Sequence, residues 1–248
     1  MSHMRKYLLL IATVFVFQQA QAQTSRPFSG WGAVFSTTKL DNRFSLHFDG
    51  QVRSSDKLQR VQTILLRPGL NYKVNKNQVA TIGYAFINNS RTIGTVSGWS
   101  PEHRIWEQYI INQSFKIGGH ATSLQHRFRL EQRFIANSIV ANNALKTDGT
   151  SFAQRLRYFA RGIFPLKPVQ QFTQGTFISL QNEIMFNIGD AAAVNGKFFD
   201  QNRAYGSFGY RFSPKADLEI GYMNQFVSGR GSVRTSNNIL QVAAYLRL

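Results

Sequence analysis

The sequence predicts an all-β protein, a single transmembrane antiparallel β-barrel of about 10–12 strands. Three observations predict it. Apolar and polar residues alternate with a period of two over segments of about ten or more residues. Short and long connections alternate between these segments, and an N-terminal export signal precedes them. Together these features are typical of an outer-membrane barrel with short periplasmic turns and longer external loops.

The first 22 residues have the pattern of a cleaved secretory signal peptide. Arg5 and Lys6 supply a positive start, residues 7–17 form an apolar run, and Ala20-Gln21-Ala22 supplies the small-x-small cleavage pattern. The run is too short to span a bilayer as a helix, although an uncleaved anchor is the alternative interpretation. We therefore expect residues 23–248 to form one barrel domain in the outer membrane, reached through the periplasm.

Composition excludes several other classes of protein. The 248 residues contain no cysteine, which excludes disulfide frameworks, thiolate zinc sites and cysteine nucleophiles. No interior run approaches the roughly 20 apolar residues of a membrane helix. Signal removal lowers the formal net charge from +17 to +15, because the first 22 residues hold two basic and no acidic residues. Export argues against nucleic acid as the partner and favours lipid head groups, lipopolysaccharide phosphates or small anions.

The period-two pattern is clearest in residues 44–53 and 123–133. In the first window Phe44, Leu46 and Phe48 share one face, while His47 and Asp49 share the other. Such alternation is the signature of a strand with one apolar face. Applied to the whole chain, it predicts strands near residues 30–40, 43–53, 58–73, 78–88, 102–117, 120–136, 151–166, 175–188, 201–213, 217–227 and 237–248.

The connections define two ends of the barrel. Short connections are expected at Asp41-Asn42, Asn75-Lys76-Asn77, Gly118-Gly119 and Ser213-Pro214-Lys215-Ala216, an intermediate one at Lys167-Pro168, and long polar ones near 89–101, 137–150, 189–200 and 228–236. With the long loops outside and the C-terminus in the periplasm, the first strand would run parallel to the last. Because single-chain bacterial barrels have even strand numbers, we expect either a twelfth strand near residues 23–30 or a wall of ten.

In a membrane barrel the apolar face of each strand meets lipid and the polar face lines the interior. By this rule Ile64 and Leu66 should face lipid, and Arg127 and Arg129 should face inward. Aromatic residues near strand ends are candidates for the interfacial girdles: Trp31, Tyr72, Trp99, Trp106, Phe164, Phe172, Tyr210 and Tyr245.

One pattern occurs twice. Tyr72-Lys73 followed by Ile82-Gly83-Tyr84 recurs at the same offset as Tyr210-Arg211 followed by Ile220-Gly221-Tyr222. Each copy spans a short polar turn, so both copies predict the same kind of hairpin. Duplication of a hairpin and independent selection of girdle residues are both open interpretations.

The main candidate site is a wall of basic residues on two neighbouring strands. Buried arginines must be paired or wet, because an isolated charge in a low-dielectric interior is costly. The expected carboxylate partners are Glu131, Glu183, and Glu102 or Glu107, from a strand whose faces the pattern does not resolve. A salt-bridged closed interior, an anion-selective lining and a specific ligand pocket are the three interpretations. The site residues are Arg127, Arg129, Glu131, Arg133, Arg155, Arg157, Arg161 and Glu183.

Other candidate chemistry is weak. His126 falls on the outer face, where it would suit a lipid hydrolase or a tolerated polar residue, but no nucleophile motif accompanies it. His47 and Asp49 share a face without a third metal ligand, and no phosphate-binding loop or dinucleotide fingerprint is present. We therefore expect no catalytic residue, no metal and no cofactor.

Five strings resemble the uncharacterised outer-membrane family named domain of unknown function 2490, found in Bacteroidetes-type bacteria. They are residues 30–32 (GWG), 66–72 (LRPGLNY), 102–108 (EHRIWEQ), 126–134 (HRFRLEQRF) and 199–203 (FDQNR). The resemblance implies a β-barrel in the cell envelope and no established activity.

Three functions follow as hypotheses. The first is a structural or interaction barrel with a narrow, salt-bridged interior, in contact with outer-membrane lipid and lipopolysaccharide. The second is a small pore for anionic solutes, and the third is a lipid-modifying enzyme. An outer-membrane barrel would also meet the barrel-assembly machinery.

Overall fold

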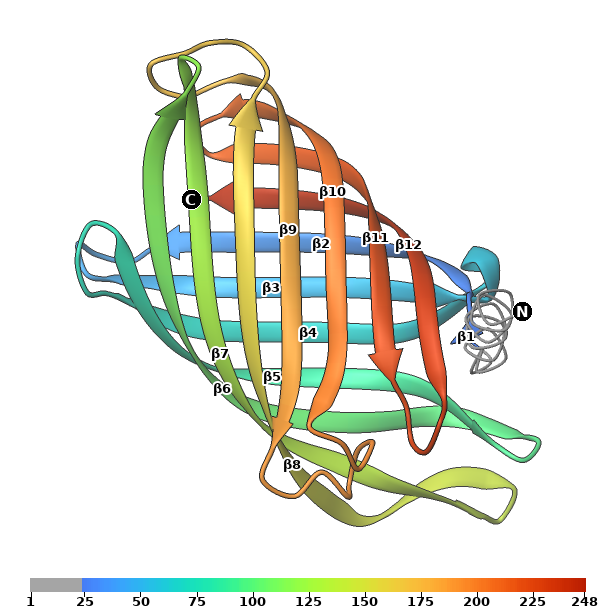
Figure 1. Ribbon diagram of the computed structural model, residues 1–248. Helices are drawn as coiled ribbons and strands as arrows, with labels where there is room; N and C mark the ends of the chain where they lie inside the picture. Colours follow the sequence, from blue (N-terminus) through green and yellow to red (C-terminus); the bar gives the residue numbers. More distant parts are fainter. Residues whose placement is uncertain (1–23) are drawn as a thin grey trace, which may run out of the picture.

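The computed structural model describes residues 24–248, which form one closed β-barrel (Figure 1). The expected signal peptide and its cleavage site lie outside the described residues. Within residues 24–248, no helix is long and apolar enough to cross a membrane. The wall consists of β2 (Phe28–Lys39), β3 (Phe44–Ser55), β4 (Arg60–Lys73), β5 (Gln78–Ile93), β6 (Val96–Ile117), β7 (His120–Ala141), β8 (Ala144–Pro165), β9 (Gly175–Ile188), β10 (Phe199–Ser213), β11 (Ala216–Ser228) and β12 (Arg234–Arg247).

A parallel seam closes the barrel. From β2 to β12 each strand pairs antiparallel with the next, and β12 then pairs in parallel with β2 over ten residue pairs (Figure 1). The two-residue strand β1 (Thr24–Ser25) continues the same edge of β12. The wall thus has eleven strands, and the expectation of an even number, ten or twelve, was wrong. Backbone groups in a parallel ladder are also satisfied, so closure does not require an even count.

All connections at one end of the barrel lie in residues 40–43, 74–77, 118–119, 166–174 and 214–215; we call this the short-turn end. At the opposite, long-loop end the connections lie in residues 56–59, 94–95, 142–143, 189–198 and 229–233, and the first of them includes the 3₁₀ turn η1 (Asp56–Leu58). The predicted short turns are confirmed, as are the loops near 189–200 and 228–236.

The long loops expected at 89–101 and 137–150 were wrong. Strands β5 and β6 continue to the turn at Gly94-Thr95, and β7 and β8 continue to Asn142-Asn143, so two hairpins project beyond the wall (Figure 1). Asn142 and Asn143 have positive φ angles of 53° and 58°, as a type I′ hairpin turn requires. The few apolar residues of these extensions, such as the consecutive Ile139 and Val140, do not alternate with polar ones, so the period-two pattern that marks the rest of the wall is absent from them.

The two predicted faces of the wall are confirmed. On β4, Leu66 points outward with 44% of its surface exposed, whereas its neighbour Arg67 points inward and is 4% exposed. Strand β6, which the sequence pattern did not resolve, turns Glu102, Arg104 and Gln108 inward, and all three are buried.

The girdle assignment was partly wrong. Tyr72, Trp99, Phe164 and Tyr210 lie on the outer face. Trp31 and Trp106 are buried inside the barrel, and Tyr245 points inward, where it stacks on Phe35. Phe172 packs against the buried Phe177 at the short-turn end. Whether an aromatic side chain points outward or inward therefore depends on its place in the alternation along the strand, and not on its distance from the strand end.

Glycines make room for the largest inward side chain. Trp106 is fully buried, and a Cβ atom at Gly69 would lie 2.8 Å from its ring. A Cβ at Gly83 would overlap the same ring, and one at Gly221 would lie 2.7 Å from the ring of Tyr205. The glycine of each repeated Ile-Gly-Tyr string therefore sits beneath an inward aromatic ring, which gives the repeat a packing reason.

We predict that Gly83→Ala destabilises the barrel by about 1–3 kcal/mol, because overpacking forces Trp106 or the backbone to shift. The urea midpoint of folding, followed by heat-dependent gel mobility, measures the change. Gly32→Ala is the matched control, since a Cβ there meets nothing within 4 Å. Equal midpoints for the two variants would contradict the packing argument.

Candidate functional site

The structure places all eight predicted site residues on the inner face of three adjacent strands. Antiparallel pairing of β7 and β8 sets Glu131 opposite Arg155 and Arg129 opposite Arg157. The inward residues are Arg127, Arg129, Glu131 and Arg133 from β7, Arg155, Arg157 and Arg161 from β8, and Glu183 from β9.

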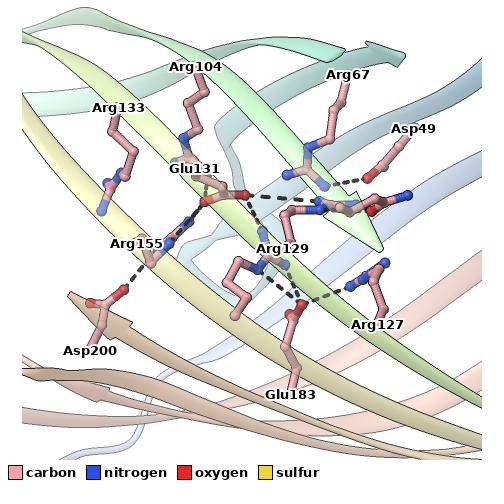
Figure 2. A network of polar contacts seen from close by, with 12 residues as sticks. Asp49, Arg67, Arg104, Arg127, Arg129, Glu131, Arg133, Arg155, Glu183 and Asp200 are labelled. Atoms are coloured by element: carbon pink, nitrogen blue, oxygen red, sulfur yellow. Dashed lines mark hydrogen bonds and ion pairs between the residues drawn. The ribbon is translucent and has the colours of Figure 1, made fainter. Parts of the chain in front are cut away.

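Glu131 is the centre of this cluster. Its side chain has no exposed surface, and three arginines donate to it (Figure 2). Its Oε2 accepts from Arg155 Nη2 at 2.7 Å and from Arg104 Nη1 at 3.2 Å, while its Oε1 accepts from Arg157 Nη1 at 2.6 Å. Both carboxylate oxygens are thus used, which compensates for the loss of water around a buried charge.

Arginines that contact two carboxylates extend the cluster toward the long-loop end. Arg104 also donates to Glu102 at 2.7 Å, and Glu102 accepts from Arg133 at 2.6 Å. Arg155 also donates to Asp200 on β10 at 2.9 Å. Asp200 is the second residue of β10, so this part of the cluster lies at the long-loop end of that strand.

A second carboxylate, Glu183, continues the cluster toward the opposite end. Arg157 joins it to Glu131, donating to Glu183 at 2.6 Å. Arg127 also donates to Glu183 at 2.8 Å, and Arg203 of β10 lies 3.5 Å from it. We call the connected set the Glu131 network: Glu102, Arg104, Arg127, Glu131, Arg133, Arg155, Arg157, Glu183, Asp200 and Arg203.

Two predicted arginines have their shortest contacts with residues outside this set. Arg161 pairs with Glu219 of β11, whose other oxygen accepts from Ser179 and Ser207. Arg129 donates to Gln108 at 2.6 Å and lies over the ring of Trp106, while its distance to Glu131 is 4.0 Å.

Sequence reasoning missed the partners contributed by β10 and β11. Asp200 was missed because it was expected in the loop near 189–200, and because alternation from Arg203 would turn it outward if the strand were extended. The pairing of β10 with β9 shifts between Phe199 and Gln201, and this irregularity turns Asp200 inward. Glu219 and Arg203 follow the alternation of their strands, so their inward direction was readable, but not which partners they meet.

The network fills the interior near the long-loop end. Glu131 is 0% exposed and Arg129 is 1% exposed, although both point into the lumen. A water-filled channel at this level would leave lumen-facing side chains accessible. Contacts such as Arg155–Asp200 and Arg161–Glu219 also bridge strands that are not neighbours in the wall. A cavity of about 290 Å³ remains beside the network, lined by residues of β2 and β3 and by network members such as Arg157, Glu183 and Arg203.

The minor candidates are placed as follows. Asp49 accepts from Arg67 at 2.7 Å, and the ring of His47 meets Trp106 edge-on. No group of three or more His, Cys, Asp or Glu side chains in residues 24–248 is arranged to hold a metal ion. His126 lies on the outer face, where it bonds the Tyr158 hydroxyl at 2.8 Å.

We predict that Glu131→Gln destabilises the barrel by about 3–5 kcal/mol, because it leaves buried guanidinium groups without their shared carboxylate. The urea midpoint of folding measures the loss. Glu107→Gln is the matched control, because Glu107 lies on the outer face of β6 and its bond is to Gln132. A midpoint for Glu131→Gln no lower than that of the control would contradict the central role of Glu131.

Comparison with known proteins agrees with the resemblance noted in the sequence. The family model described as "Protein of unknown function (DUF2490)" matches residues 28–236. An uncharacterised protein of Methylorubrum extorquens is 23% identical over 242 residues, covering 96% of this chain and 97% of that protein. No solved structure matches the chain. Because the family model spans nearly the whole barrel, the chain belongs to the DUF2490 family.

Proposed function

We propose that this chain is an outer-membrane β-barrel with a closed interior, and that it acts as a structural or interaction barrel. The proposal includes no enzymatic activity and no diffusion pore. The observation that carries it is the Glu131 network, whose buried charges occupy the lumen near the long-loop end.

The outer surface supports membrane insertion. Monomeric soluble proteins rarely expose continuous apolar patches of more than a few hundred Å². Here outward apolar side chains follow one another around the wall, on strands of 12 to 22 residues, longer than the roughly 9–11 residues of a tilted spanning strand. They include Val34, Leu46, Val52, Leu66, Ile82, Ile105, Phe128, Leu156, Leu180, Phe208, Ile220 and Val242, all 40–57% exposed.

The long-loop end supports a contact with lipopolysaccharide. Its exposed basic side chains give it the charge to attract phosphate groups. The loops there also hold each other, since Lys197 donates to the Gly231 carbonyl at 2.5 Å and Arg230 donates to the Ala192 carbonyl. The basic residues are Arg26, Lys57, Arg91, Lys146, Arg230 and Arg234.

We predict that Leu66→Arg lowers the stability of the barrel in lipid by about 2–4 kcal/mol, because Leu66 lies midway along β4 and a charge there meets hydrocarbon. Urea unfolding in phospholipid vesicles measures the cost. Tyr72→Arg at the strand end is the control, expected to cost about 0–1 kcal/mol. Equal effects at the two positions would argue against a membrane around the middle of the wall.

We predict that the purified protein inserts into planar bilayers without steady ionic conductance, because the buried side chains of the Glu131 network occupy the lumen. Heat-dependent gel mobility of the same sample verifies that it is folded. Steady single-channel currents with a chloride-over-potassium reversal potential would contradict closure and favour the pore hypothesis.

A further inference from the structure

The Glu131 network fills part of the lumen, and a cavity lies beside it along β2 and β3. The cavity of about 290 Å³ extends from Arg53 and Trp31 to Thr37 and Arg247, which lie at the short-turn ends of β2 and β12. A second cavity of about 210 Å³ shares its lining residues Arg161, Tyr245 and Arg247. Together the two cavities lead from the short-turn end to the Glu131 network.

The larger cavity is strongly basic. Its lining contains two carboxylates, and both already serve arginines: Asp49 is paired with Arg67, and Glu183 is shared by Arg127, Arg157 and Arg203. Of the seven arginines in this lining, Arg161 and Arg247 pair with Glu219 and Asp217 outside it, so the other five exceed the two lining carboxylates by three. The seven arginines are Arg53, Arg67, Arg127, Arg157, Arg161, Arg203 and Arg247.

Two of these arginines flank an indole ring. The guanidinium of Arg53 lies 3.9 Å from the ring centre of Trp31, and that of Arg203 lies 5.1 Å from it. Arg53 donates to Gln51, and within residues 24–248 no ion pair joins it to a carboxylate. Two like charges are thus held beside one ring, and the only carboxylate that either contacts in the described residues is Glu183, which Arg203 shares with Arg127 and Arg157. An anion would stabilise this arrangement.

Several donors around the cavity also have no acceptor. In the described part of the chain, the buried Nε atoms of Arg67, Arg127, Arg161 and Arg203 make no hydrogen bond. Arg67 is 4% exposed, so bulk water does not satisfy its free N–H group. Buried donors normally have partners, and guanidinium groups match the oxygens of phosphate and carboxylate groups.

We propose that the cavity, which runs along β2 and β3 from Trp31 and Arg53 near the long-loop end to Thr37 at the short-turn end, is a binding site for a small polyanion with at least two phosphate or carboxylate groups. The charge excess calls for more than one negative charge. The volume lies at the lower limit of the roughly 300–1,000 Å³ typical of ligand pockets, which favours a small molecule. Arg53 and Arg203 are the ligand-binding residues, and Trp31 supplies an aromatic wall. The site goes beyond the proposed function, because a closed barrel does not require it.

Titration calorimetry of the full-length barrel, refolded in lipopolysaccharide-free neutral detergent, tests the site. The probes are inorganic phosphate, pyrophosphate and citrate. We expect saturable one-to-one binding of pyrophosphate or citrate, at least ten-fold tighter than phosphate. Arg53→Gln and Arg203→Gln should each weaken this binding at least ten-fold. Arg133→Gln is the control, because Arg133 also points inward but lies outside the cavity; it should change the affinity less than three-fold.

Stability separates a binding role from a structural one. Without ligand, Arg53→Gln should keep or raise the urea midpoint, because it removes a charge that has no carboxylate partner. With pyrophosphate, the wild-type midpoint should rise while that of Arg53→Gln stays constant. A lower ligand-free midpoint for Arg53→Gln would assign Arg53 a structural role and overturn the proposal.

Three other results would also overturn the site. They are no saturable binding of either polyanion, full binding by Arg53→Gln, and equal loss in the Arg133→Gln control. Binding that appears only after anionic lipid vesicles are added would identify a head group at the surface instead. None of these results bears on closure, which bilayer conductance tests independently.

Discussion

The buried Glu131 carboxylate is the interaction on which the interior depends. Three arginines from two strands share its two oxygens, and each of them reaches a second carboxylate. Strands β6 to β10 are thereby tied together through the lumen as well as through the wall. Burying so many charges costs desolvation that pairing only offsets. The network therefore contributes a defined arrangement of side chains more than it contributes net stability.

The same constraint divides the lumen. Where carboxylates match arginines, long side chains meet across the barrel and exclude water. Beside the network, along β2 and β3, arginines outnumber carboxylates, and like-charged side chains leave a cavity between them. Closure and ligand capacity are thus two results of one uneven distribution of charge across the lumen.

Which side chains point inward was largely predictable from the sequence, because the alternation of apolar and polar residues is a local signal. The inward direction of Arg127, Arg129 and Glu131 follows from parity on a single strand. Asp200 was not predictable, because it was expected in a loop and because a one-residue irregularity at the start of β10 reverses the alternation without a signal in composition. The parallel seam was inferred from the orientation of the loops and then set aside on the general rule of even strand numbers. The inward position of Trp106 was missed because the sequence pattern did not show which face of its strand points inward. Its need for Gly69 and Gly83 depends on the register of three neighbouring strands, β4, β5 and β6.

The parallel seam also determines how the two ends of the chain could be linked in a circular permutant. Because β2 and β12 run in the same direction, Thr24 and Leu248 lie at opposite ends of the wall. A circular permutant would therefore need a connection as long as β2, whose 12 residues at about 3.3 Å each span roughly 40 Å. Such a connection would run antiparallel to both neighbours. Inserted between them, it would become a twelfth strand and replace the parallel pairing with two antiparallel ladders.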